Sequence, residues 1–234
     1  MNINLPKIIG HRGVKDLAPE NTIASLEESM RHNLKWIEVD VKVSKDNIPF
    51  LLHDDFLDRT TSGKGYPYNY LYKEIFRLDA GSWFNKKFSN VYPPTLEEVL
   101  IWIYNHLNPG GSAVFRIHSV FSHIGADLGN DTKVPIPHLL FPRHIIDDFL
   151  QETSGSSSRY TSPMSSSSYL MLFHRVGFEI IDVVKLSGGI KDKDTYAMFQ
   201  DKLWFYSKDE LNSGGIIVHL KKPIIERDIS ELEV

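Results

Sequence analysis

The sequence has no cysteine among its 234 residues, which excludes disulfides, thiolate metal sites and cysteine nucleophiles. It also lacks an excess of positive charge, because 26 Lys and Arg residues against 30 Asp and Glu residues give a net charge of −4. Such a charge provides no general attraction to nucleic acid or to an anionic membrane. No apolar run is long enough to cross a bilayer, and no signal-peptide pattern stands at the N-terminus. We therefore expect a cytoplasmic protein without nucleic acid as a partner, and the oligomeric state stays open.

The segment from Trp36 to Asp55 carries the residues around which the N-terminal part is organised. Residues 37–43 alternate with a period of two, which predicts a strand that places Glu38 and Asp40 on one face. Two carboxylates at this spacing repel each other, and a cation between them removes the repulsion. A second apolar run then ends on His53. The alternative is a solvated strand face with a histidine there by chance.

The residues before this segment predict a strand–helix–strand unit. Residues 7–10 are a short apolar strand that leads into His11 and Arg12, and the polar residues 19–22 are a turn and a helix cap. The stripe expected on the inner face of the helix consists of Ile23, Leu26 and Met30. Parallel strands joined in this way end at the same rim, so His11 and Arg12 should meet Glu38 there, with His53 nearby.

These side chains suit one kind of chemistry. Carboxylate oxygens are the ligands that Mg²⁺ and Ca²⁺ prefer, and an arginine binds a phosphate through two hydrogen bonds. Two histidines at the same rim can act as general acid and general base. Together they favour metal-assisted hydrolysis of a phosphate ester.

Short motifs resemble the signature of the glycerophosphodiester phosphodiesterase family, at that family's spacings. The motifs are His11-Arg12-Gly13, Pro19-Glu20-Asn21-Thr22, Glu38-Val39-Asp40 and His53-Asp54, with further agreement at residues 57–61, 78–84 and 94–100. The resemblance covers roughly residues 5 to 106. It implies a (β/α)₈ barrel with a small insertion at residues 54–92.

The resemblance also implies roles for five residues. Glu38 and Asp40 would bind a divalent metal, Mg²⁺ or Ca²⁺. His11 and His53 would be the acid and the base, and Arg12 would hold the substrate phosphate. The implied partner is a small-molecule glycerophosphodiester.

A complete barrel of this kind needs about 250 residues, and the sequence after residue 106 does not continue the family pattern. A third acidic metal ligand is not found. Instead, residues 107–230 resemble the C-terminal half of a class I S-adenosylmethionine-dependent methyltransferase. The signals are a Pro-Gly-Gly turn before the strand 113–117, a Gly-Phe-Glu entry to the strand 178–182, and a last strand at 215–223. The glycine-rich cofactor loop of that fold is missing, so no cofactor-binding residue is predicted.

We therefore expect an α/β chain of two parts. Residues 1–106 would be the N-terminal part of a (β/α)₈ TIM-barrel-like phosphodiesterase, joined to a partial Rossmann-like methyltransferase segment at residues 107–234. The second part should contain a helix over residues 144–151 and a Ser-rich loop at residues 154–168. The chain would then be a chimera of two truncated folds.

The leading functional hypothesis is metal-dependent hydrolysis of glycerophosphodiesters to glycerol 3-phosphate and an alcohol, with activity lowered by the incomplete barrel. One alternative is a methyltransferase-like protein that lacks its cofactor loop. Another is a fusion protein that binds a metal or a phosphate without catalysis. Binding of S-adenosylmethionine would distinguish the first alternative, and turnover of glycerophosphocholine would distinguish the second.

Overall fold

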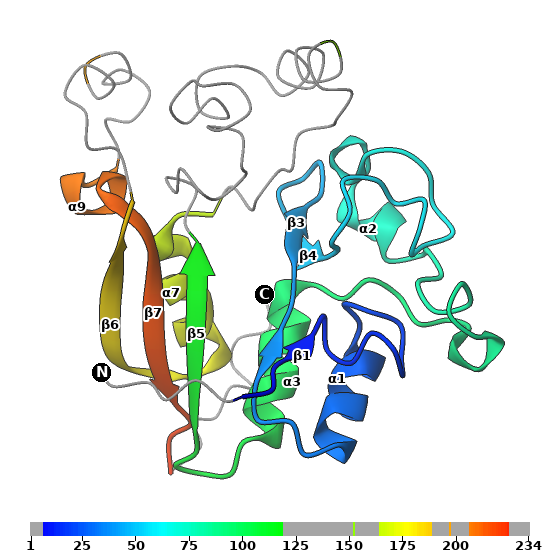
Figure 1. Cartoon of the computed structure of the whole chain (residues 1–234). Coiled ribbons are helices and arrows are strands. Elements are labelled where there is room, and N and C mark those ends of the chain that lie inside the picture. The colour runs from blue at the N-terminus through cyan, green and yellow to red at the C-terminus, as the bar shows by residue number, and fades with distance from the viewer. Residues whose placement is uncertain (1–6, 119–151, 153–163, 189–196, 198–205, 225–234) are drawn as a thin grey trace. The chain divides into compact units, whose positions relative to one another are not determined.

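The computed structural model describes residues 7–118, 152, 164–188, 197 and 206–224. The chain divides into two compact units, Met1–Trp102 and Ile103–Val234, which are described separately (Figure 1). Within the described residues, no helix is long and apolar enough to cross a membrane.

The first unit begins with the predicted strand–helix–strand arrangement. Strand β1 (Gly10–His11) and strand β2 (Ile37–Glu38) are parallel, with Gly10 opposite Ile37 and His11 opposite Glu38. The predicted strand at residues 7–10 was too early, because the described pairing starts only at Gly10. The β1–β2 pairing still brings the ends of both strands to one edge, as the sequence indicated.

Helix α1 (Ile23–Arg31) starts at Thr22, whose hydroxyl oxygen accepts the Ser25 backbone N–H at 3.3 Å. This is the cap that the sequence predicted. The expected stripe is only partly correct. Leu26 is fully buried, but Met30 is 45% exposed, and the buried positions beside Leu26 are Ser25 and Ser29. The Ser25 hydroxyl donates to the carbonyl of Arg12 at 3.1 Å, so this face of the helix contacts polar backbone rather than an apolar layer.

The predicted strand at residues 37–43 is interrupted. It consists of β2 and of β3 (Val41–Val43), which pairs antiparallel with β4 (Pro49–Leu51). The turn between β3 and β4 has Asn47 at φ 60°, in the left-handed region that asparagine tolerates. The apolar run ends as predicted, and His53 follows β4 after one residue.

The remainder of the first unit packs around the end of β4. It contains the short helices η1 (Pro67–Asn69), α2 (Tyr72–Ile75) and η2 (Lys86–Phe88). A buried apolar cluster holds this part to the strand, and its members are Phe50, Leu52, Leu57 and Ile75. The segment after His53 is therefore held against β4 by this apolar cluster, through Leu57 and Ile75.

Helix α3 (Leu96–His106) begins at a capping box formed by Thr95 and Glu98. The Thr95 hydroxyl accepts the backbone N–H of Glu98 at 3.0 Å, and a Glu98 carboxylate oxygen accepts the backbone N–H of Thr95 at 2.7 Å. The buried positions near the start of the helix are Leu96, Val99 and Leu100, as their spacing predicts.

The second unit contains a three-stranded antiparallel sheet in the order β5-β7-β6 (Figure 1). Its strands are β5 (Ser112–His118), β6 (Glu179–Ser187) and β7 (Ser213–Lys221). All three begin within two residues of the positions expected from the sequence, and β6 lies at an edge of the sheet. Val218 and Leu220 of the central strand are fully buried.

Two helices accompany this sheet, α7 (Ser166–Val176) and the short α9 (Lys208–Leu211). Helix α7 ends at Gly177, which adopts φ 104°, a conformation that glycine allows at low cost. The Ser-rich loop was predicted to reach Ser168, but the last three of these residues form the first turn of α7, because the Ser165 hydroxyl caps it. The predicted helix at residues 144–151 lies outside the described residues.

Candidate active site

The His11-Arg12-Gly13 motif is a turn with two consecutive left-handed residues. Arg12 has φ 55° and Gly13 has φ 81°. A Cβ atom at Gly13 would collide with the Ser25 side chain, so both the conformation and the close approach of α1 require glycine. The turn leaves His11 half exposed, and it turns the largely buried Arg12 side chain inwards.

Glu38 lies beside this turn. Its carboxylate oxygen Oε2 accepts the backbone N–H of Arg12 at 3.2 Å, and His11 Nε2 lies 3.9 Å from the same oxygen. Partial burial raises the pKa of Glu38, and the negative charge of Asp40 raises it further. The two carboxylates are therefore near enough to repel each other, as their spacing on the sequence indicates.

Asp40 is held by Asn21, which precedes α1. The Asn21 side chain accepts the Asp40 backbone N–H at 3.0 Å and donates its amide to Asp40 Oδ2 at 3.0 Å. The guanidinium Nε of Arg12 lies 3.4 Å from the same oxygen, but its N–H is buried and makes no hydrogen bond in the described structure. The contact between Arg12 and Asp40 is therefore an ion pair without hydrogen-bond geometry.

Glu20 lies between two arginines and is 7% exposed. It accepts Arg12 Nη1 at 2.8 Å, and it accepts Arg59 Nη1 and Nη2 at 2.9 and 2.7 Å. Burial by itself would raise the pKa of Glu20, but the hydrogen bonds from Arg59 and Arg12 outweigh it and lower this pKa. Glu20 is thus an ionised carboxylate that fixes both guanidinium groups.

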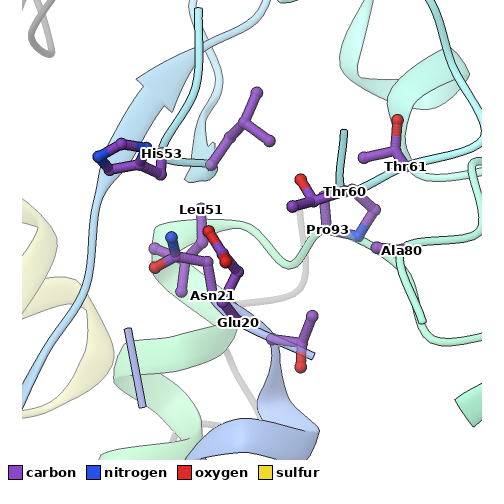
Figure 2. A pocket seen from close by; sticks show the side chains of 10 residues that line it. Glu20, Asn21, Leu51, His53, Thr60, Thr61, Ala80 and Pro93 are labelled. Atoms are coloured by element: carbon purple, nitrogen blue, oxygen red, sulfur yellow. The ribbon is translucent and has the colours of Figure 1, made fainter. Parts of the chain in front are cut away.

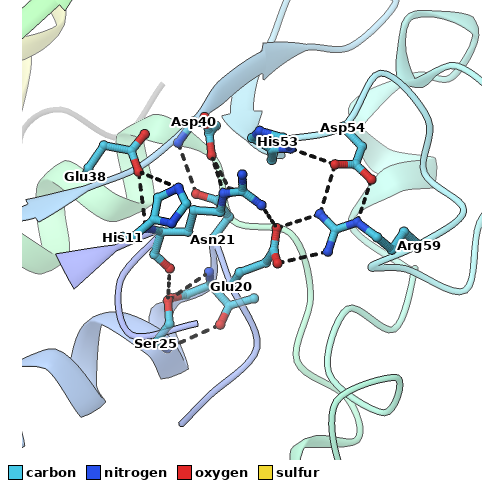
Figure 3. Close-up of polar contacts among 11 residues, drawn as sticks. His11, Glu20, Asn21, Ser25, Glu38, Asp40, His53, Asp54 and Arg59 are labelled. Carbon is cyan, nitrogen blue, oxygen red and sulfur yellow. Dashed lines mark hydrogen bonds and ion pairs between the residues drawn. The ribbon is translucent and has the colours of Figure 1, made fainter. Parts of the chain in front are cut away.

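His53 is connected to the same network through Asp54. Its Nδ1 lies 2.7 Å from Asp54 Oδ1, and Arg59 donates to Asp54 through Nε at 2.6 Å and Nη2 at 2.9 Å (Figure 3). The hydrogen bonds from Arg59 lower the pKa of Asp54 to about 2, and the contact with His53 contributes to the lowering. The hydrogen bonds to Asp54 and Glu20 in turn raise the pKa of Arg59.

A small pocket adjoins this network, and His53 and Glu20 are on its wall (Figure 2). Its other walls come from the start of α1, the end of β4 and the segment around α2 and η2. The lining residues are Glu20, Asn21, Thr22, Leu51, Leu52, His53, Thr60, Thr61, Ala80 and Pro93. The pocket is therefore lined by both polar and apolar side chains.

The fit of this region to a divalent metal is partial. The oxygens of Glu38 and Asp40 are the donor type that Mg²⁺ and Ca²⁺ prefer, and their mutual repulsion is what a cation would relieve. The described residues contain no cluster of three or more His, Cys, Asp or Glu side chains arranged for a metal ion. Two carboxylates could hold a metal whose other ligands are water molecules.

The structure gathers His11, Arg12, Glu38 and Asp40 at the end of the β1–β2 pair, and it links His53 to them through Glu20 (Figure 3). Sequence reasoning missed four further members of this network, which are Glu20, Asn21, Asp54 and Arg59. All four stand inside segments that resemble the family signature, since Arg59 belongs to residues 57–61, so the resemblance was a signal for them. Nothing in the local sequence pairs Arg59 with a residue 39 positions away.

Comparisons with known proteins give matches to the first part of the chain. The model of the "Glycerophosphoryl diester phosphodiesterase family" matches residues 11–111. A glycerophosphodiester phosphodiesterase of Bacillus subtilis (strain 168) is 38% identical over 108 residues, 43% of this chain and 37% of the relative. The enzyme of that name from Caldanaerobacter subterraneus is 42% identical over 92 residues, 39% of this chain and 38% of the relative.

Two solved structures are also similar in sequence. The glycerophosphodiester phosphodiesterase of Agrobacterium tumefaciens is 39% identical, with 43% of this chain and 44% of that chain covered and a TM-score of 0.42. An Oleispira antarctica phosphodiesterase in complex with the product sn-glycerol-3-phosphate is 44% identical, with 43% and 41% covered and a TM-score of 0.42.

The family match ends at Gly111, and the comparisons do not support the resemblance of residues 107–230 to a methyltransferase. The chain spans 37% to 38% of the length of the two curated relatives above. Residues 11–111 are a domain of the glycerophosphoryl diester phosphodiesterase family that is truncated relative to those relatives.

Proposed function

We propose that this chain hydrolyses glycerophosphodiesters to glycerol 3-phosphate and an alcohol. The observation that carries the proposal is the gathering of His11 and Arg12 against Glu38 and Asp40 at the end of the β1–β2 pair, within the residues that match the family. A phosphodiester needs charge neutralisation and proton transfer, and these groups provide both.

Arg12 is assigned to the substrate phosphate. Its Nη1 is held by Glu20, whereas its buried Nε–H has no hydrogen-bond partner among the described residues. A phosphate oxygen could accept the hydrogen bond that Asp40, 3.4 Å from Nε but without hydrogen-bond geometry, does not accept. The positive φ of Arg12 adds strain of about 1–3 kcal/mol, which is common at functional sites.

Glu38 and Asp40 are assigned to a divalent cation, Mg²⁺ or Ca²⁺, completed by water. A bound cation would polarise a phosphoryl oxygen and neutralise its charge. His11 and His53 are assigned as the general acid and general base. Each can transfer a proton through Nε2, because His53 Nδ1 faces Asp54 and His11 Nε2 is on the side of Glu38.

The rate is expected to be lower than that of a relative with all its strands. A shift of 1 Å in a catalytic group can cost roughly 10²-fold, and the described residues supply only two carboxylates for the metal. We expect turnover well below about 10 s⁻¹, the median for enzymes.

The test is hydrolysis of glycerophosphocholine by the full chain, with added Mg²⁺ or Ca²⁺ and with EDTA. His11→Ala and His53→Ala should each lower the metal-dependent rate by about 10²–10⁴-fold. His32→Ala is the matched control, because His32 is half exposed and pairs with Glu28 at the end of α1. The proposal is wrong if the rate is the same in EDTA, or if both histidine variants keep the wild-type rate.

Binding of the cation can be measured apart from turnover. Calorimetric titration with Ca²⁺ and Mg²⁺ should show weak binding that the double change Glu38→Gln, Asp40→Asn removes. Unchanged binding in the double variant would place the cation elsewhere.

The resemblance of residues 107–230 to a methyltransferase stays a prediction. We expect no binding of S-adenosylmethionine, because the glycine-rich turn that lets the backbone approach such a cofactor is missing from this segment. Saturable binding at micromolar cofactor would overturn this expectation.

A further inference from the structure

We propose that Asp54 and Arg59 are positioning residues for His53, and that Arg59 joins His53 and Arg12 into one rigid unit through Glu20. The inference rests on the proposed function, because it concerns the geometry of the groups assigned above. It adds two residues for which the resemblance implied no role.

The backbone around His53 is fixed on both sides. Before it, the Leu52 backbone N–H donates to the Asp40 carbonyl at 3.1 Å, and after it, Asp55 accepts Lys42 Nζ from β3 at 2.8 Å. The Lys42 and Asp55 side chains are 11% and 10% exposed, so this ion pair is shielded from water. The freedom left to His53 is the rotation of its own ring, which is 42% exposed.

Asp54 removes that freedom. An ionised carboxylate only accepts hydrogen bonds, so the short contact at Asp54 Oδ1 requires that His53 Nδ1 carry the proton. The neutral ring then keeps an unprotonated Nε2, the nitrogen that is needed to accept a proton. Asp54 stays ionised because Arg59 lowers its pKa to about 2.

Arg59 donates hydrogen bonds to two carboxylates, those of Asp54 and Glu20. Nε and Nη2 donate to Asp54, while Nη1 and Nη2 donate to Glu20, and both contacts are bidentate, as a guanidinium group allows. Four N–H···O contacts leave little of the group for a substrate, although Arg59 is 44% exposed. The arrangement therefore suits positioning rather than substrate binding.

Glu20 links Arg59 to Arg12 through hydrogen bonds. Its Oε1 accepts both Arg12 Nη1 and Arg59 Nη2, at 2.8 and 2.7 Å. A lysine at position 59 would keep the positive charge but could not grip two carboxylates in this way. A substitution of Arg59 should thus disturb the ring of His53 and the guanidinium of Arg12 together.

The tautomer of His53 is measured by ¹⁵N-edited NMR of the imidazole ring in the full chain, without substrate or metal. Wild type should carry the proton on Nδ1. In Asp54→Asn the amide can donate to the ring, so the proton should move to Nε2, and in Arg59→Lys the two tautomers should be mixed. The matched controls are Asp16→Asn and Arg77→Lys, at exposed positions of the same unit, and both should leave the tautomer unchanged.

Hydrolysis provides the second readout. Asp54→Asn and Arg59→Lys should each lower kcat by about 10- to 100-fold, the usual effect of losing a partner that orients a functional histidine. KM should change less than kcat in Asp54→Asn, whereas Arg59→Lys should also raise KM, because it disturbs Arg12 as well. The proposal is overturned if the His53 tautomer in both variants is that of wild type. If the wild-type chain shows no hydrolysis, the proposed function fails while the tautomer still decides this inference. Should Asp54→Asn not fold, Arg59→Lys carries the same test.

Discussion

The strands of the first unit are two or three residues long, whereas those of the sheet in the second unit are seven to nine residues long. In the sheet, backbone groups satisfy one another along continuous ladders. Around β2 the ladder stops after Glu38, and the backbone N–H of Asp40 goes to the Asn21 side chain instead. Where the strands are interrupted, polar side chains such as Asn21 pair with the backbone groups that the ladder leaves free, and the candidate site lies there.

The largest expected difference between the two units concerns their cores. Phe50 is fully buried in the apolar cluster at the end of β4, so Phe50→Ala should lower the free energy of unfolding of the first unit by about 3–5 kcal/mol. Hydrogen exchange followed by mass spectrometry should show faster exchange in β3 and β4 but unchanged exchange in β7. Phe76→Ala is the control at a 46% exposed position and should cost less than about 1 kcal/mol. Equal acceleration in β7 would mean that the two units unfold together.

The next effect concerns the charged network of the first unit. Glu20→Gln replaces an oxygen that accepts from two arginines by an amide, so it should lower the free energy of unfolding by about 1–3 kcal/mol. Urea unfolding of the full chain measures the change. Glu28→Gln, which removes the pairing of this carboxylate with Arg31 and His32 at the surface of the same unit, should cost much less than Glu20→Gln. Equal costs for the two variants would show that burial of Glu20 is not decisive.

The two units should also differ in their response to acid. The folded-state pKa of Asp54 is about 2 against an ordinary value of 3.8, so its contribution to stability is complete above pH about 4 and is lost as the pH falls towards 2. The pKa of Glu20 is lowered too, which acts in the same direction. Between pH 4 and 2, hydrogen exchange should accelerate more around His53 than in β7, and Asp54→Asn should reduce this difference. A difference of the same size in Asp54→Asn would assign the acid sensitivity to other groups.

The smallest effect is expected at the surface of the second unit. Lys185 pairs with Asp209 at 2.7 Å, but the side chains are 58% and 78% exposed, so Lys185→Ala should change stability by less than about 0.5 kcal/mol. Lys42→Ala removes the shielded partner of Asp55 in the first unit and should cost about 1–3 kcal/mol. Urea unfolding compares the two, and a larger loss from Lys185→Ala would contradict the ranking.

Several features of the site could be predicted because they depend on near neighbours along the chain. The cap at Thr22, the capping box at Thr95 and the turn at Asn47 each arise within four residues. The proximity of Glu38 and Asp40 follows from a period of two, and it persists although the strand is interrupted between them. The exposure of Met30 could not be predicted in this way, because it depends on which face of α1 the turn at Arg12 approaches.

The sequence alone indicated that His11, Arg12, Glu38 and Asp40 meet at one edge, that β1 and β2 pair in parallel, and where the strands of the second unit begin. These follow from periodicity, capping chemistry and chain connectivity, all of which act over short separations. Only the tertiary structure decided that Glu20 bridges Arg12 and Arg59 and that Asp54 holds His53, because charged side chains 39 residues apart choose partners by where folding brings them. The buried carboxylate of Glu20 is stable in its ionised form because the fold places two arginines, Arg12 and Arg59, within hydrogen-bond distance of it.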